Sequence, residues 1–133
     1  MFNEEDGDAT LVYSLLEWMH RTKADFTNTF AALAQPVADK SFRQWQETWL
    51  ARLARQPQSS EESAQLRRTH NPAFIPRNHL VEAALAAGQQ GDLGPLERLL
   101  EILAAPYDPT RAAPEYRSPD PSGGGDYKTF CGT

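Results

Sequence analysis

The chain has 133 residues, 40% of them hydrophobic, and its net charge of −5 fits a folded globular protein rather than a disordered one. A single cysteine excludes an internal disulfide framework and a zinc site built from several cysteines. No apolar run approaches the roughly 20 residues that a membrane helix needs, and the first residues do not resemble a signal peptide. We therefore expect a cytoplasmic protein with no membrane partner.

Two helices are predicted in the first third of the chain. The first spans about residues 9 to 21, and Asp8 is its expected N-cap. Asp25 is expected to cap a second, shorter helix, which Pro36 ends because proline cannot continue a helix. The first prediction depends on apolar residues at helical spacing, namely Leu11, Val12, Leu15, Leu16, Trp18 and Met19.

Two further helices are predicted before the middle of the chain. Ser41 is expected to begin the third, with Gln44 as its capping-box partner. After a proline- and serine-containing linker, a short polar helix covers residues 61 to 69. One face of the third helix is strongly apolar and is expected to be core: Phe42, Trp45, Trp49, Leu50 and Leu53.

The stretch His-Asn-Pro-Ala-Phe-Ile-Pro-Arg-Asn-His joins the fourth helix to the next one. Pro72 forces Asn71 out of the helical conformation, so the fourth helix must end there. Pro76 is expected in the first turn of the following helix, where its missing N–H costs nothing. We expect Arg77 and Asn78 to bond backbone carbonyls around the two prolines, which is a structural role rather than substrate binding.

A helical hairpin and a tail are predicted in the last part. One helix starts near Leu80 and ends at Gly88, and Asp92 caps the next, whose many leucines predict a central position in the bundle. Beyond Ala105 the chain becomes rich in proline and glycine. The predicted fold is therefore all-α, an irregular bundle of about five to six helices over residues 1–105 with an extended C-terminal tail over residues 106–133.

The sequence offers no catalytic, cofactor-binding or metal-ligating set. His20, His70 and His79 lack the paired spacing of metal ligands. Residues 40 to 79 carry seven Lys or Arg and three Glu, a net charge of about +4. This stretch is either a solvated face or a patch for an acidic partner or for phosphates. Nucleic acid is not expected as a partner, because the whole chain is acidic and has no recognised reader module.

Several stretches, in the same order, resemble the C-terminal part of the selenoprotein O (SelO, also called YdiU) family, whose members are much longer. Together they extend over essentially the whole chain. They are Gly7-Asp8-Ala9, Ala24-Asp25-Phe26-Thr27-x-Thr29-Phe30, Asn71-Pro72-x-Phe74-Ile75-x-Arg77-Asn78-His79, Pro106-Tyr107-Asp108 and Tyr127-Lys128-Thr129-Phe130-Cys131-Gly132-Thr133.

The resemblance implies a kinase-like adenylyltransferase (a pseudokinase) that transfers AMP from ATP, with Mg, to protein hydroxyl groups. The family's phosphate-cradling lysine and metal-holding residues lie upstream of the matched part, so no catalytic residue and no cofactor is assigned to this chain. Its implied partner is the kinase-like catalytic part of the protein. One family feature maps here, a redox residue on Cys131. Cysteine rather than selenocysteine there suggests a bacterial protein.

Two functional hypotheses remain open at this point. In the first, the chain is the helical C-terminal part of a protein adenylyltransferase, inactive alone and structural or redox-regulatory. In the second, it is a free-standing helical interaction module without enzymatic activity. Two interpretations of Cys131 also remain open, a redox contact to the kinase-like body and an inert exposed thiol in a loose tail.

Overall fold

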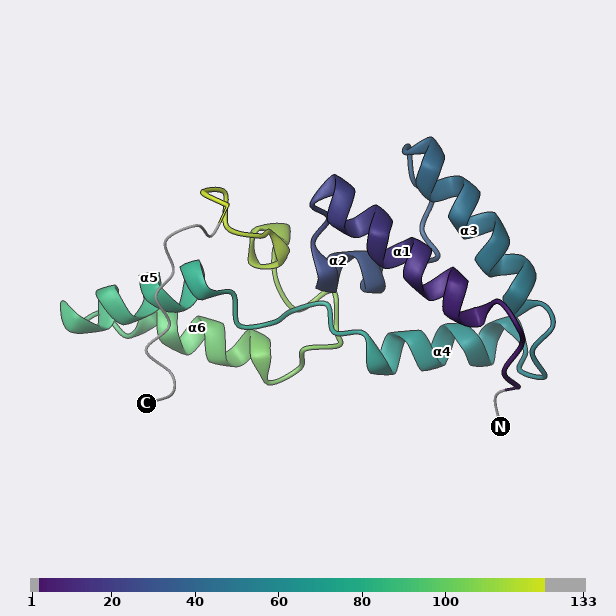
Figure 1. The fold of residues 1–133 in the computed structure, drawn as a ribbon. Coiled ribbons are helices and arrows are strands. Elements are labelled where there is room, and N and C mark those ends of the chain that lie inside the picture. Colours follow the sequence, from purple (N-terminus) through teal and green to yellow (C-terminus); the bar gives the residue numbers. More distant parts are fainter. Residues whose placement is uncertain (1–2, 124–133) are drawn as a thin grey trace, which may run out of the picture. The chain divides into compact units, whose positions relative to one another are not determined.

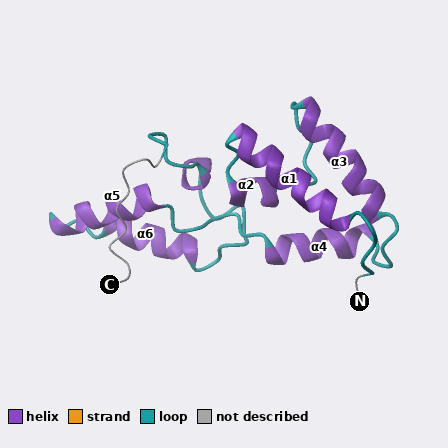
Figure 2. Ribbon diagram, in the orientation of Figure 1, coloured by secondary structure: helices purple, strands orange, loops and turns teal. Residues whose placement is uncertain are grey.

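Helices make up the regular structure of residues 3–123, the part of the chain that the computed structural model describes. Within this part, Figure 2 shows helices and loops and no strand. The all-α fold class is thereby confirmed. The helices are α1 (Asp8–Thr22), α2 (Phe26–Ala31), α3 (Lys40–Leu53), α4 (Ser60–His70), α5 (Asn78–Gln89), α6 (Gly94–Leu103) and the short 3-10 helix η1 (Pro114–Arg117).

The chain divides into two compact units, Met1–Asn71 and Pro72–Thr133. We call them the N-terminal unit, which holds α1 to α4, and the C-terminal unit, which holds α5, α6 and η1. The division falls between Asn71 and Pro72, where the proline was expected to end the fourth helix. The sequence-based division into 1–105 and 106–133 stays a prediction.

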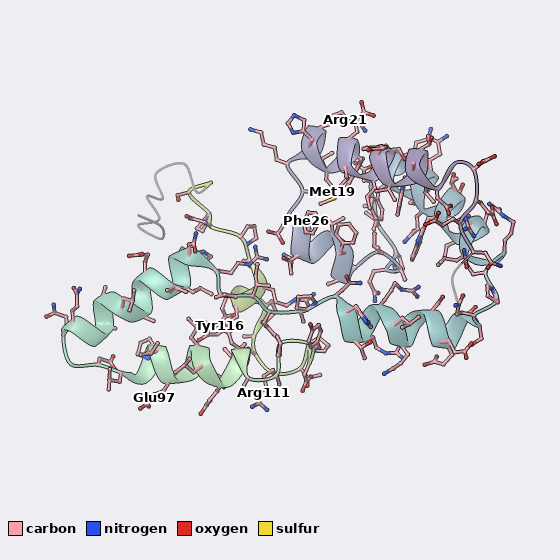
Figure 3. All side chains as sticks on the ribbon, turned by 60° about the horizontal axis from the view of Figure 1, so that its bottom comes forward. Met19, Arg21, Phe26, Glu97, Arg111 and Tyr116 are labelled. Carbon is pink, nitrogen blue, oxygen red and sulfur yellow. The ribbon has the colours of Figure 1, made fainter. Side chains whose placement is uncertain are left out.

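The N-terminal unit has an aromatic core. Helix α1 packs against α3 (Figure 1), and Phe42 of α3 is 3% exposed. The Phe42 ring centroid lies 4.7 Å from that of Trp18 on α1 and 5.6 Å from that of Trp45 one turn along α3. Met19 lies on the side of α1 that faces α2 (Figure 3), and it is buried in the same core cluster as Phe42.

The expected N-caps of α1 and α3 are both wrong, because a different residue holds each position. Gly7, with a φ of 104°, precedes α1, and Asp8 is the first helical residue instead of the cap. Asp39 caps α3, accepting a hydrogen bond of 2.8 Å from the Phe42 N–H, whereas Ser41 was expected in that role with Gln44. The Asp39 carboxylate stands two residues earlier and accepts more strongly than a hydroxyl.

Two caps agree with local sequence rules. Asp25 caps α2 as predicted, and its carboxylate accepts from the Asn28 N–H. Ser59 and Glu62 form a full capping box at the start of α4, each accepting from the other's backbone N–H. This cap orients the polar helix that follows the linker.

The C-terminal unit is built on the predicted hairpin of α5 and α6 (Figure 1). The expectation that α6 lies centrally is wrong, because only one of its faces is covered. Leu99 and Ile102 are buried, while Leu93 and Leu100 are 53% and 60% exposed. The expectation that Asp92 is the N-cap of α6 is wrong, because Leu93 holds that position. The Asp92 carboxylate accepts a hydrogen bond from the Gly94 N–H.

The first part of the predicted tail is packed onto this hairpin. The Pro106 carbonyl accepts from the Ala73 and Phe74 N–H groups, at 2.8 and 3.1 Å. Ala112 and Tyr116 pack against the core that contains Phe74, and Figure 3 shows Tyr116 beside the hairpin. Apolar anchors this sparse give no sequence periodicity, so the packing was not predicted. Cys131 lies outside the described residues.

None of the helices in the described part of the chain has the length and apolar character needed to cross a lipid bilayer.

A charged network ties the start of the N-terminal unit to the end of α3. Arg52 is 7% exposed, and its Nε lies 2.6 Å from the Asp8 carboxylate. Its Nη1 lies 3.2 Å from Glu5, and its Nη2 donates to the Asn3 carbonyl. The hydrogen bond from Arg52, and next that from the Glu5 backbone N–H, lower the pKa of Asp8 to about 2.

The pKa of Asp8 is expected to rise toward its ordinary value of 3.8 in an Arg52→Met variant. In the wild type the folded pKa is depressed, so the contribution of Asp8 to stability is present above about pH 4 and is lost as the pH falls toward 2. A carboxyl-detected NMR titration measures this directly. An unchanged Asp8 pKa in the variant would show that Arg52 does not stabilise the ionised Asp8 carboxylate.

Candidate functional site at the joint of residues 71 to 79

The joint begins where Pro72 ends α4, as predicted. Asn71 is the C-cap residue, with extended backbone angles (φ −108°, ψ 105°), and its N–H still donates to the Arg67 carbonyl. This conformation is the one that a following proline favours. The chain therefore leaves the helix at the boundary between the two units.

The second proline lies outside α5, in contrast to the prediction. Arg77 is the N-cap residue of α5, with φ −70° and ψ 126°, and α5 begins at Asn78. The Arg77 carbonyl accepts from the Leu80 and Val81 N–H groups. Pro76 therefore precedes the cap, where it fixes the backbone direction before the helix instead of within its first turn.

Between the prolines the chain is anchored in the core. Phe74 is 1% exposed and packs with Ala73 and Ile102. The N–H groups of Ala73 and Phe74 share the Pro106 carbonyl as acceptor. Burial of an aromatic ring together with satisfied backbone groups holds this irregular segment in one conformation.

The polar residues of the joint differ in their contacts. The Arg77 Nη2 donates to the Arg117 carbonyl at 3.0 Å, so α5 is tied to the end of η1. The Asn78 side chain is exposed and makes no hydrogen bond within residues 3–123. The expected structural role thus has a contact to support it at Arg77 and none at Asn78, and for both residues it stays a prediction.

A surface hollow of about 260 Å³ adjoins the joint. Asp120 faces it, and its pKa is lowered by hydrogen bonds from the Ser122 hydroxyl and backbone N–H and, more weakly, by His79. The hollow brings together residues about 40 positions apart in sequence. They are Ile75, Pro76, Arg77, Asn78, His79, Pro119 and Asp120.

The chemistry available in this hollow is limited. The hollow is lined by an acidic side chain, Asp120, and a basic one, Arg77. Arg77 already donates a hydrogen bond to a backbone carbonyl. Within residues 3–123, no three His, Cys, Asp or Glu side chains are grouped so that they could hold a metal ion. Sequence reasoning missed Pro119 and Asp120, because no local pattern marks a residue that reaches the joint from the opposite end of the unit.

An Arg77→Ala variant is expected to lower the free energy of unfolding of the C-terminal unit by about 1.5–3 kcal/mol, the range for a hydrogen bond from a charged group. Thermal unfolding followed by far-UV circular dichroism measures the change. Asn78→Ala is the matched control and should be close to neutral, because its side chain is exposed. Equal stability of the two variants would contradict a structural role for Arg77.

Comparison with known proteins shows what the whole chain is similar to. No protein-family model matches the chain. The whole chain aligns at 46% identity with the Protein nucleotidyltransferase YdiU of Syntrophotalea carbinolica, and at 45% and 40% with the YdiU proteins of Alkaliphilus metalliredigens and Bacillus mycoides. In each case the chain covers 29% of the relative.

These relatives are protein nucleotidyltransferases by name, and the chain is similar to them along its entire length. The resemblance to the YdiU family is therefore confirmed, and the chain corresponds to a C-terminal portion of such a protein. It spans less than a third of the length of the curated relatives that it matches.

Proposed function

We propose that the chain is the C-terminal helical part of a protein adenylyltransferase, an enzyme that transfers AMP from ATP to protein hydroxyl groups. One observation carries the proposal: similarity over the whole chain to proteins named protein nucleotidyltransferase, of which it covers 29%. The part outside this segment is the kinase-like catalytic body, which is the partner of the chain. ATP and Mg are cofactors of that body.

In this proposal the chain serves a structural role and carries no catalytic residue. Nucleotidyl transfer needs a lysine on the phosphates and carboxylates on the metal. Of the lysines in the described part, Lys23 lies at the C-cap of α1 and Lys40 at the start of α3, each set by its helix. At the joint, Arg77 also has a structural contact, because its guanidinium donates a hydrogen bond to the Arg117 carbonyl. A redox-regulatory role falls to Cys131, on the grounds of the resemblance alone.

The isolated chain is expected not to bind Mg-ATP and not to label proteins with AMP. Calorimetric titration with Mg-ATP and a labelling assay with a radioactive or biotinylated ATP analogue test both statements. Micromolar binding, or labelling by the chain alone, would contradict the proposal that its role is non-catalytic.

A chimera tests the positive part of the proposal. In the Syntrophotalea carbinolica relative, the segment that matches this chain is replaced by the chain itself. We expect AMP labelling close to that of the unaltered relative, whereas a version without the segment is expected to lose it. A chimera that folds but does not label proteins would favour the alternative, a helical interaction module without enzymatic activity.

A further inference from the structure

The surface between α3 and α4 contains two neighbouring hollows within the N-terminal unit. The first, of about 320 Å³, is mostly apolar and lies toward the end of α4. The second, of about 370 Å³, lies toward its start and is more polar, with Gln58, Ser59 and Ser60 on its wall. Leu53, Ser63 and Arg67 line both of them. The two hollows therefore adjoin at these three residues, and we call them together the α3–α4 groove.

Arg67 is half-buried, and no carboxylate of the described residues forms an ion pair with it. Its guanidinium lies 5.2 Å from the centroid of the Trp49 ring, a cation–π contact. No acidic side chain of residues 3–123 lies within ion-pair distance of it. Its neighbour Arg68, by contrast, is exposed and pairs with Glu61 at 2.7 Å. Burial, and next the charge of Arg68, lower the pKa of Arg67.

The surroundings of Arg67 favour an anion that also has an apolar part. Trp49, Leu53 and Leu66 line the apolar hollow on one side of it. Arg52, Arg55 and Arg68 each pair with a carboxylate, whereas Arg67 pairs with none within residues 3–123. A bound carboxylate would compensate the uncompensated charge of Arg67, and an adjacent apolar side chain would remove the exposed surface of the hollow from water.

We propose that the α3–α4 groove binds an acidic peptide segment, with a bulky apolar side chain in the hollow lined by Trp49 and Leu66 and a nearby carboxylate on Arg67. The groove continues past Arg67 into the second, more polar hollow. A peptide fills such an elongated groove because its backbone carries on beyond the carboxylate. A compact organic acid occupies the apolar hollow alone.

The test uses the whole chain, isotopically labelled for NMR, and an acetylated and amidated peptide Gly-Ser-Leu-Ser-Glu-Ser-Gly. We expect saturable binding below about 1 mM, with shifts concentrated on the Trp49 indole N–H and on the amides of Ser63, Leu66 and Arg67. A peptide with glutamine in place of glutamate, and one with alanine in place of leucine, should each bind at least about 10-fold more weakly. Equal affinity of the three peptides, or no binding by the first, overturns the proposal.

Variants of the chain locate the site. Arg67→Gln is expected to weaken binding at least about 10-fold, whereas the matched control Arg68→Gln changes it less than about 2-fold because Arg68 is exposed and paired elsewhere. Equal loss in both variants overturns the proposal. Hexanoate binding as tightly as the peptide also overturns it, in favour of a small organic acid. The peptide arm uses the unaltered chain, so it stays decisive if Arg67→Gln is poorly folded.

Discussion

Phe74→Ala is expected to unfold the C-terminal unit at temperatures where the wild-type unit is folded. The ring is 1% exposed and fills the core formed with Ala73 and Ile102. Removing a buried Phe side chain costs about 3–5 kcal/mol, because apolar contacts are lost and a cavity remains. That is a large share of the ~5–15 kcal/mol that stabilises a typical domain.

The placement of the tryptophans makes this result easy to resolve. Trp18, Trp45 and Trp49 all lie in the N-terminal unit, so tryptophan emission reports on that unit alone. In Phe74→Ala, far-UV circular dichroism should lose part of its helical signal while tryptophan emission stays native. Tyr107→Ala is the control, since Tyr107 is 49% exposed. A simultaneous change of both signals would show that the two units unfold together.

Phe42→Ala is expected to have the reciprocal effect on the N-terminal unit. Phe42 is buried between the rings of Trp18 and Trp45, at centroid distances of 4.7 and 5.6 Å. Its removal costs about 3–5 kcal/mol by the same cavity argument, and it takes away two aromatic contacts that hold α1 against α3.

The emission of all three tryptophans should shift toward that of exposed indole in Phe42→Ala, while part of the helical signal persists from α5 and α6. Phe26→Ala is the matched control, because this ring is 62% exposed and contacts Phe30 at a centroid distance of 4.7 Å. A native emission spectrum in Phe42→Ala, or a loss as large in Phe26→Ala, would contradict this account of the core.

The helices were predictable from sequence because each carries its own local signal. Leu15 and Met19 recur at helical spacing in α1, and Leu99 and Ile102 do so in α6. The extent of burial was not predictable. The leucines of α6 appear equally apolar in sequence, yet Leu99 is buried and Leu100 is exposed, because burial depends on what else packs against the helix.

The end of α4 before Pro72 was predictable, whereas the position of Pro76 outside α5 and the contacts between distant residues were not. Pro72 marks the end of α4 by sterics that involve only its neighbour Asn71. The contact of Arg77 with the Arg117 carbonyl spans 40 positions, and nothing in the sequence near either residue encodes it. The Arg52 network with Asp8 spans 44 positions and was missed for the same reason. Cys131, the redox candidate, lies outside the described residues.

The shared Pro106 carbonyl has a kinetic consequence. Its bonds with Ala73 and Phe74 close a loop that encloses the α5–α6 hairpin. The helix contacts inside that loop are local in sequence and form quickly, whereas the closing contact waits for the loop ends to meet. Exchange of the Ala73 and Phe74 amide hydrogens with solvent therefore follows the opening of the whole loop rather than the fraying of either helix.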